Sequence, residues 1–334
     1  MTLTQELAMP TTRSEAATHL QSDWAGIRLS FGRMGTRKTL TTGQRQTAAD
    51  QFDAAGDYIS AGKKLIDTRD PAFKKVSAVL TKARECWQDS TLPYPEPGVR
   101  LIRQDRIDYL TGKLAGFQAE LAEAVATLGA RYDELRERAR GKLGDLYNPA
   151  DYPATLDGLF RIEWDLPSLA PPEYLMGNPN LYAEQSAKIA ARFNEAVSLA
   201  EDAFIAELAD SIDALQRKLN GLDDGTEKRL HGSTLENLSA FFERFKTLNL
   251  HSSAELDRIV DQAEAALSGK SLIGGQAVTR DELRDSASIR ADVRSRLAGV
   301  TATLDGMMVS RPRRAITRRS KAADTTEPAA EPQE

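Results

Sequence analysis

Two long stretches of this chain carry apolar side chains at the spacing of an amphipathic helix. In residues 104–143 and 179–220 the apolar positions recur every three or four residues, with polar and charged residues between them. The first stripe comprises Ile107, Leu110, Leu114, Phe117, Leu121, Ala124 and Leu128, and Tyr132, Leu135 and Ala139 continue it after one shift. The second comprises Leu181, Ile189, Phe193, Val197, Ala200, Phe204, Leu208, Ile212, Leu215 and Leu219. This heptad-like period predicts two long helices, the first of about 40 residues and roughly 60 Å.

Each predicted helix carries an apolar stripe that must be buried against another surface. We expect the two helices to pair with each other as a long antiparallel, coiled-coil-like hairpin over residues 104–220. The alternative is that part of a stripe stays open to a partner or to a second copy, which would make an oligomer through the hairpin.

Shorter segments alternate apolar and polar residues and predict strands. In residues 26–33 the side chains of Ile27, Leu29 and Phe31 share one face. Residues 160–168 alternate in the same way, and residues 99–103 form a further short candidate. A lone strand leaves its backbone hydrogen-bonding groups unpaired, so we expect these segments to meet in one small sheet. The insert at 145–178, between the two long helices, then returns a strand to that sheet.

The remaining segments complete an α+β fold that is predominantly helical. Residues 23–103 are expected to hold a strand and helices, including one over 41–66 and one over 71–89 with Asp70 as its N-cap and Pro71 in its first turn. Residues 221–310 read as C-terminal helices that pack on the hairpin, and Thr279 with Glu282 predicts a capping box at a helix start among them. Residues 1–22 lack a sustained period and predict a flexible N-terminus, and residues 311–334 keep only one large apolar residue, Ile316, and predict a disordered tail.

Composition and charge narrow the possible functions. The 334 residues carry a formal net charge of −5, so any polyanion binding must come from a local patch. The single cysteine, Cys86, excludes a disulfide within the chain and a cysteine metal cluster. The N-terminus lacks the pattern of a secretory signal and no apolar run is long enough to cross a bilayer, so we expect a cytoplasmic protein without a membrane contact.

One motif comes close to a nucleotide-binding loop. The stretch GRMGTRKT, residues 32–39, differs from the P-loop pattern at Arg37, which stands where a glycine must precede the lysine. The arginine side chain would crowd a turn whose backbone has to wrap phosphates closely. The stretch TLTTG also separates Lys38 from the next predicted helix, and no apolar strand ending in aspartate follows to hold magnesium. We therefore interpret the stretch as a strand that continues into a basic turn.

Two basic segments are candidates for contact with nucleic acid or with an acidic partner. Residues 28–45 contain cations and no acid, and residues 311–321 contain six cations and no acid. No aromatic residue is interleaved in the tail segment, so stacking on bases is not supported there. The candidate contact residues are Arg33, Arg37, Lys38, Arg311, Arg313, Arg314, Arg318 and Arg319.

The sequence offers no residues for catalysis, for a cofactor or for a metal. None of His19, His231 and His251 stands at metal-ligand spacing from another ligand type on one helical face. Cys86 lies on the apolar side of a predicted helix, where a buried structural thiol is the expected state. We expect a protein that is not an enzyme.

Several segments together resemble a family of uncharacterised proteins of bacteria, plasmids and phages, defined as a domain of unknown function. The resemblance spans residues 26–310 and rests on KKLIDTRDPAFKKV, GKLGDLYNPADYPA, FRIEWDLPSL and STLENLSAFFERFKTLNLHSSAELDRIVDQAEAAL. Such proteins are often encoded near a MoxR-type AAA+ ATPase and a von Willebrand factor A-type protein. The resemblance implies an adaptor or substrate of that pair, and it assigns no active residue. The alternative is a DNA-associated phage or plasmid protein that uses segments 28–45 and 311–321.

Overall fold

The computed structural model describes residues 13–224, 232–267 and 279–310. Ten labelled helices and six strands cover most of these residues. The helices are α1 (Arg13–Asp23), α2 (Thr42–Asp50), α3 (Pro71–Asp89), α4 (Ile107–Gly129), α5 (Tyr132–Leu143), α6 (Pro179–Asp224), α7 (Gly232–Leu248), α8 (Ala254–Leu267), α9 (Arg280–Asp285) and α10 (Ala287–Ser310). The strands are β1 (Trp24–Gly32), β2 (Arg37–Thr39), β3 (Gly62–Lys64), β4 (Leu92–Pro93), β5 (Val99–Arg103) and β6 (Arg161–Asp165). The described protein is therefore mostly helical with small antiparallel sheets, as the sequence predicts.

The three segments expected to share a sheet do so. They form a four-stranded antiparallel sheet with β4 in the order β4-β5-β1-β6. Strand β1 is the centre: Ile27 lies opposite Arg100 on β5, and Phe31 lies opposite Ile162 on β6. The two partners pair with different halves of β1: β5 with residues 24–28 on one edge and β6 with residues 28–32 on the other, so each half has backbone hydrogen bonds to a neighbouring strand.

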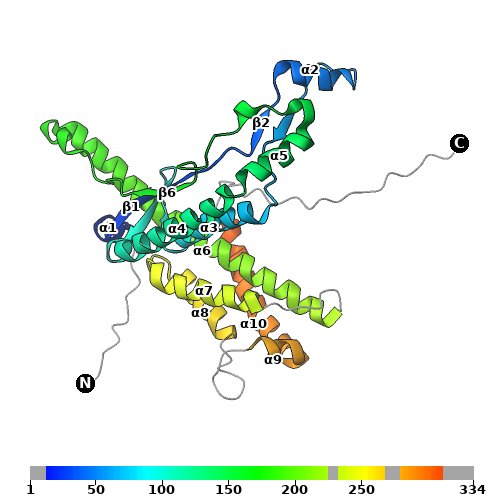
Figure 1. Ribbon diagram of the computed structural model, residues 1–334. Helices are drawn as coiled ribbons and strands as arrows, with labels where there is room; N and C mark the ends of the chain where they lie inside the picture. The colour runs from blue at the N-terminus through cyan, green and yellow to red at the C-terminus, as the bar shows by residue number, and fades with distance from the viewer. Residues whose placement is uncertain (1–12, 225–231, 268–278, 311–334) are drawn as a thin grey trace.

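Both faces of this sheet are buried, and each face belongs to a different hydrophobic core. Ile27, Leu29 and Ile102 point toward the core formed with α3, α4 and the start of α5. Trp24 and Leu101 point the other way, into the core formed with α1, α6 and the C-terminal helices. Alternate residues of a strand face opposite sides, so one strand contributes to both cores. Figure 1 shows α3 and α4 on one side of the sheet and α6 crossing on the other.

The expected hairpin of two long helices is wrong, and the sheet is the physical reason. The stripe of α4 is buried against α3, while the stripe of α6 is buried against α1, α7 and α10. The sheet lies between the two layers and offers an apolar face to each. Since the chain's own helices cover both stripes over most of their length, an oligomer through this hairpin loses its basis among the described residues.

Three local expectations also need correction. The first long helix breaks at Ala130 and Arg131 into α4 and α5, where its stripe shifts. The helix expected over 41–66 ends at Asp50, and residues 62–64 instead form β3, which pairs with β2. Residues 13–22 of the expected flexible N-terminus belong to α1, whose Ala16, Ala17 and Leu20 are buried. Residues 1–12 and the tail 311–334 lie outside the described residues.

Local signals at helix starts are mostly confirmed. The Asp70 carboxylate accepts a hydrogen bond from the Ala72 amide, and Pro71 occupies the first turn of α3. Among the C-terminal helices, Thr279 and Glu282 form a reciprocal capping box at α9. Side-chain contact with the nearby backbone decides such caps, so they can be predicted from a few residues. Helices α7, α8 and α10 pack with α6, and Phe204 of α6 meets Phe241 and Phe245 of α7 edge-on.

Two parts project from the body of the molecule. One is an arm built from β2, β3, α2 and α5, and the other is the beginning of α6 with the preceding 3-10 helix η4 (Glu173–Gly177) (Figure 1). In α5 the guanidinium of Arg136 lies over the rings of Tyr132 and Tyr152, which ties the segment after α5 to the arm. Within the described residues, no helix has the length and apolar character needed to span a bilayer.

The close approach at Gly26 yields a stability prediction. A Cβ added there would lie 2.9 Å from the carbonyl oxygen of Pro167 and 3.0 Å from a Leu169 methyl. We expect Gly26→Ala to lower the free energy of unfolding by about 1 to 3 kcal/mol, because backbone must shift.

Gly112 provides the matched control, since it lies in the interior of α4 with no atom within 4 Å of its added Cβ. Gly112→Ala should stabilise by about 0.5 to 1 kcal/mol through helix propensity. Urea denaturation measures both values. Equal effects of the two substitutions would show that β1 does not pack as described.

Candidate interaction surfaces

The first basic segment, residues 28–45, spreads over the sheet and the arm rather than forming one turn. Arg28 lies in the central sheet with acids on two sides, 3.4 Å from Glu96 and 3.9 Å from Asp165. Arg33 lies with its guanidinium 5.6 Å from the ring centroid of Phe31. Arg37 and Lys38 belong to strand β2 on the arm. The expected basic turn is therefore wrong at these two residues, because β3 pairs with them.

Lys38, the lysine of the near nucleotide loop, takes part in an internal ion-pair cluster. Its Nζ donates to Oδ1 of Asp151 at 2.6 Å, and Nζ of Lys63 lies 2.6 Å from Oδ2 of the same carboxylate. Lys63 also donates to the carbonyl oxygen of Leu146 at 2.6 Å. The Lys63 and Asp151 side chains are only 5% and 2% exposed. Lys38 thus joins the β2–β3 hairpin to the 3-10 helix η3 (Pro149–Asp151).

This cluster explains how the arm accommodates several cations on neighbouring strands. In the β2–β3 ladder Lys38 lies opposite Lys63, and Arg37 lies opposite Lys64. Like charges directly opposite each other are destabilising. Asp151 offsets the first pair, and hydrogen bonds from Lys38 and Lys63 hold its pKa below the ordinary value of 3.8. Within the described ranges, no carboxylate forms an ion pair with Arg37 or Lys64.

The arm also contains a groove that the sequence did not predict. It has a volume of about 730 Å³ and lies between β3, α5 and the start of α3. Lys63 and Lys64 line it, and both fell inside the helix expected over 41–66. The signal that distinguishes this stretch is the pair of glycines, Gly56 and Gly62, before Lys63.

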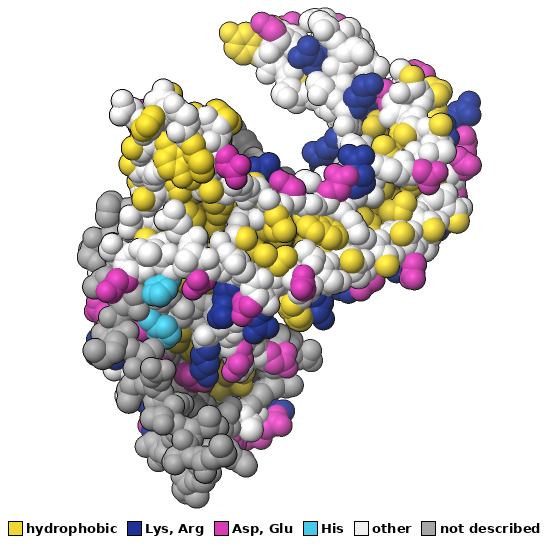
Figure 2. Space-filling view, turned by 90° about the vertical axis from the view of Figure 1, so that its left-hand side faces the viewer, with side chains coloured by type: hydrophobic (Ala, Val, Ile, Leu, Met, Phe, Trp, Pro, Cys, Tyr) yellow, Lys and Arg dark blue, Asp and Glu magenta, His cyan; other side chains and the backbone are white. Residues whose placement is uncertain are grey.

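Large apolar side chains are exposed at both projecting ends. At the tip of the arm, Phe52 and Tyr58 are 78% and 90% exposed. At the other projection, Tyr174 and Met176 of η4 are 82% and 63% exposed, and Leu181 in the first turn of α6 is 42% exposed. Figure 2 shows hydrophobic side chains gathered on one projection and Lys and Arg side chains along the facing edge of the arm, with a hollow between them. We call these two sets the arm tip and the α6 end.

Cys86 and His251, considered above for catalysis or metal binding, take part in helix packing and in a turn. Burial raises the pKa of the Cys86 thiol, which keeps it in the neutral form. Nδ1 of His251 lies 3.0 Å from Asp257, and the Asn249 side chain donates to the same carboxylate at 2.6 Å. This trio closes the turn between α7 and α8. Over the described ranges, no three His, Cys, Asp or Glu side chains gather in a way that could hold a metal ion.

The remaining candidate contacts cannot be placed on this surface. Residues Arg311, Arg313, Arg314, Arg318 and Arg319 lie outside the described residues. Comparison with known proteins adds no assignment: no protein-family model, no curated protein and no solved structure matches the chain.

The Asp151 cluster predicts a local loss of stability. Asp151→Asn leaves Lys63 buried without its carboxylate, and breaking a buried pair in this way costs about 3 kcal/mol or more. We expect faster amide hydrogen exchange in β2 and β3, with little change in β1. Asp157→Asn is the control, because Asp157 is exposed in the same connecting segment. Unchanged exchange in the arm of the Asp151 variant would contradict a role of the cluster in holding it.

The lowered pKa of Asp151 also predicts a pH dependence. The unfolded chain binds a proton to this carboxyl more readily than the folded chain, so stability rises with pH across the range between the two pKa values. The contribution is complete above a pH of about 4 and is lost as the pH falls through the lowered pKa. The difference in arm protection between wild type and Asp151→Asn should therefore shrink on acidification. A difference that grows at low pH would contradict this sign.

Proposed function

We propose that this chain is a non-enzymatic interaction protein that bridges two protein partners. The observation that carries the proposal is the presence of large exposed apolar side chains at two separate projections, the arm tip and the α6 end. Single exposed apolar residues are ordinary, but aromatic and methionine side chains gathered at a projecting end are typical of contact sites. Two such ends on one molecule favour simultaneous contact with two partners.

The geometry of the α6 end supports a direct role in binding. The stripe of α6 becomes buried only from Ile189 onward, so the first turns of the helix extend beyond the core. Helix α6 continues without interruption into the core, where Phe193 and Val197 are buried. A partner bound at Tyr174 and Met176 would therefore contact a rigid extension of the body. A preorganised surface loses less conformational entropy on binding.

The identity of the partners comes from the sequence resemblance. It implies a MoxR-type AAA+ ATPase and a von Willebrand factor A-type protein, in a bacterial, plasmid or phage setting and in the cytoplasm. In this proposal ATP hydrolysis belongs to the ATPase, and the present chain connects that enzyme to the second protein. The involvement of Lys38 with Asp151 supports the assignment of nucleotide chemistry to the neighbour.

A DNA-associated role through segments 28–45 and 311–321 is the competing proposal. It requires free cations at the surface, since phosphate contacts supply most of non-specific affinity. Two of the cations in the first segment already face carboxylates, Lys38 at Asp151 and Arg28 at Glu96 and Asp165. We therefore place protein contact before nucleic-acid contact, and nuclease treatment in a bridging experiment separates the two.

Bridging can be measured with purified proteins. An immobilised von Willebrand factor A-type protein from the same genome should retain the MoxR-type ATPase only when the present chain is added, and nuclease treatment should leave retention unchanged. Phe52→Ser with Tyr58→Ser should lose one partner, and Tyr174→Ser with Met176→Ser should lose the other. Removing clustered apolar anchors typically costs about 2 kcal/mol or more, about a thirtyfold loss in affinity.

Tyr109→Ser is the matched control, because Tyr109 is 55% exposed on α4 and belongs to neither end. It should retain both partners. Retention of both partners by both double variants would overturn the two-ended arrangement. Retention that disappears on nuclease treatment would favour the DNA-associated role instead.

A further inference from the structure

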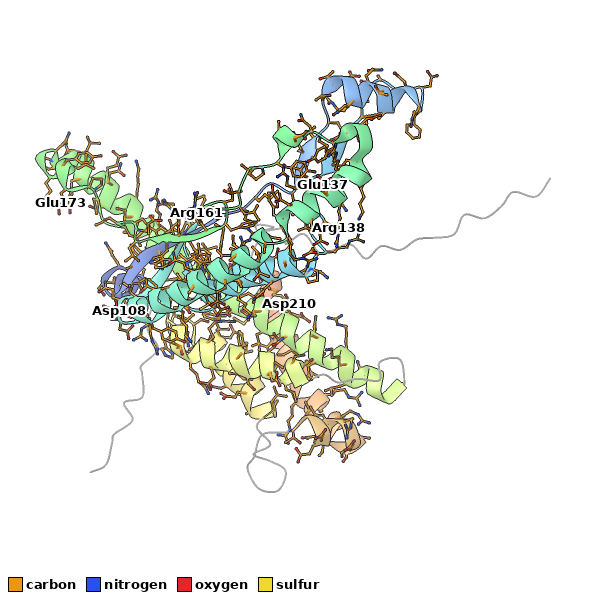
Figure 3. The ribbon with its side chains drawn as sticks, viewed as in Figure 1. Asp108, Glu137, Arg138, Arg161, Glu173 and Asp210 are labelled. Atoms are coloured by element: carbon orange, nitrogen blue, oxygen red, sulfur yellow. The ribbon has the colours of Figure 1, made fainter. Side chains whose placement is uncertain are left out.

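The groove on the arm has the size and enclosure of a site for a few side chains. Its volume is about 730 Å³, within the range of ordinary ligand clefts. Strand β3 supplies one wall, α5 supplies the opposite wall, and Asp67 to Pro71 close one end at the start of α3. Arg138, labelled in Figure 3, belongs to the α5 wall. The groove is thus framed by regular elements rather than by a loose loop.

The floor of the groove is apolar. Ile66, Leu135 and Ala139 are buried beneath it, whereas Leu40, Leu143 and Leu146 are only partly buried and present hydrocarbon to solvent. Covering such surface is favourable by about 25 cal/mol for each Å² of apolar area removed from water. The floor therefore favours an occupant with an apolar side chain.

The rim of the groove is cationic in a chain that is acidic as a whole. Its lining includes the cations Lys63, Lys64, Arg69, Arg138 and Lys142, against the acids Asp67 and Asp70. The Asp70 carboxylate is already engaged, since it caps α3 and lies 3.1 Å from Arg131. Asp67 accepts from Arg69 at 3.1 Å and lies 3.8 Å from Lys142. Lys63 pairs with Asp151 and Arg138 with Glu134, so Lys64 is the lining cation that has no carboxylate partner among the described residues.

The β2–β3 ladder already contains one pair of opposed cations whose charge is offset by a carboxylate. One pair of opposed cations, Lys38 and Lys63, holds the Asp151 carboxylate between its two amino groups. The second pair, Arg37 and Lys64, also lies directly opposite in the ladder, with its side chains on the other face of the hairpin. Lys64 lines the groove, and both side chains are exposed. A carboxylate from outside would offset this pair as Asp151 offsets the first.

We propose that the groove binds an acidic peptide segment of a partner protein. One carboxylate of the segment pairs with Arg37 and Lys64, and a neighbouring apolar side chain covers Leu40, Leu143 and Leu146. A polynucleotide fits less well, because its phosphates cannot cover the apolar floor and no aromatic side chain lines the groove for base stacking. The inference deepens the proposed function and rests on it, since it states the chemistry of one partner contact on the arm.

The test uses the full-length chain and labelled synthetic probes, so that it does not depend on any bridging assay. The probes are a short peptide rich in glutamate and leucine, the same peptide with serine for leucine, the same peptide with glutamine for glutamate, and a single-stranded DNA. Fluorescence anisotropy gives each Kd. The glutamate–leucine peptide should bind most tightly, and both altered peptides should bind at least about tenfold more weakly, the factor that corresponds to one lost contact of modest strength.

Charge reversal on the protein locates the site. Lys64→Glu should weaken binding of the glutamate–leucine peptide by about a hundredfold, in the range found when one member of a close charge pair is changed. The variant should fold, because the introduced carboxylate attracts the guanidinium of Arg37 where the lysine repelled it, and its melting temperature should not fall. Lys82→Glu is the control: it makes the same charge change at an exposed position of α3 outside the groove.

Each outcome supports or overturns the proposal. Weakening by Lys64→Glu but not by Lys82→Glu supports it. Four outcomes would each overturn it. The two variants could weaken peptide binding equally, or the serine-substituted peptide could bind as tightly as the glutamate–leucine peptide. The wild type could also bind DNA more tightly than peptide, or bind no peptide. Retention of both partners by the arm-tip and α6-end double variants, with peptide binding intact, would count against the proposed function while leaving the groove.

Discussion

The structure depends on β1 being buried on both faces and paired with β5 along its first half and with β6 along its second half. Its neighbours β5 and β6 use its backbone hydrogen-bonding groups, and its alternate side chains enter two separate cores. Gly26 allows the chain after β6 to approach this strand closely, since any larger residue would meet the Pro167 carbonyl. A small sheet with two apolar faces keeps the helical layers apart, so each long helix finds its partners on its own side.

In the arm, buried charged side chains have partners that offset their charge. A thin projection cannot bury much apolar surface, and its hairpin carries opposed cations. The Asp151 carboxylate offsets one pair and links the hairpin to η3, while the Tyr132–Arg136–Tyr152 contacts fasten the following segment to α5. The last three residues of the stretch that resembles a nucleotide loop, Arg37–Thr39, therefore form a strand that supports the arm. The second cation pair is left at the surface, beside an apolar groove.

These features give the molecule separate surfaces on a shared rigid frame. Arg244 of α7 connects the two layers, because its guanidinium lies 3.1 Å from Asp89 of α3 and also contacts Glu207 of α6. The arm is attached to the layer that contains α3 and α4, and the α6 end extends from the other layer. This arrangement is the basis of the proposal that the chain bridges two partners and that the arm groove binds an acidic segment of one of them.

The sequence by itself determined the local features: the helical stripes, the alternating strands, the Asp70 and Thr279 caps, and the mismatch of Arg37 with a nucleotide loop. Each depends on side chains a few residues apart, whose geometry the local backbone sets. Only the tertiary structure decided which surfaces meet. An apolar stripe shows that Leu114 or Leu208 must be buried, but it does not show which surface buries them. Packing against another helix or against a sheet face removes the same apolar area from water. The groove and the Asp151 cluster were hidden for the same reason, since they join residues far apart in the chain, as Lys38 and Asp151 are.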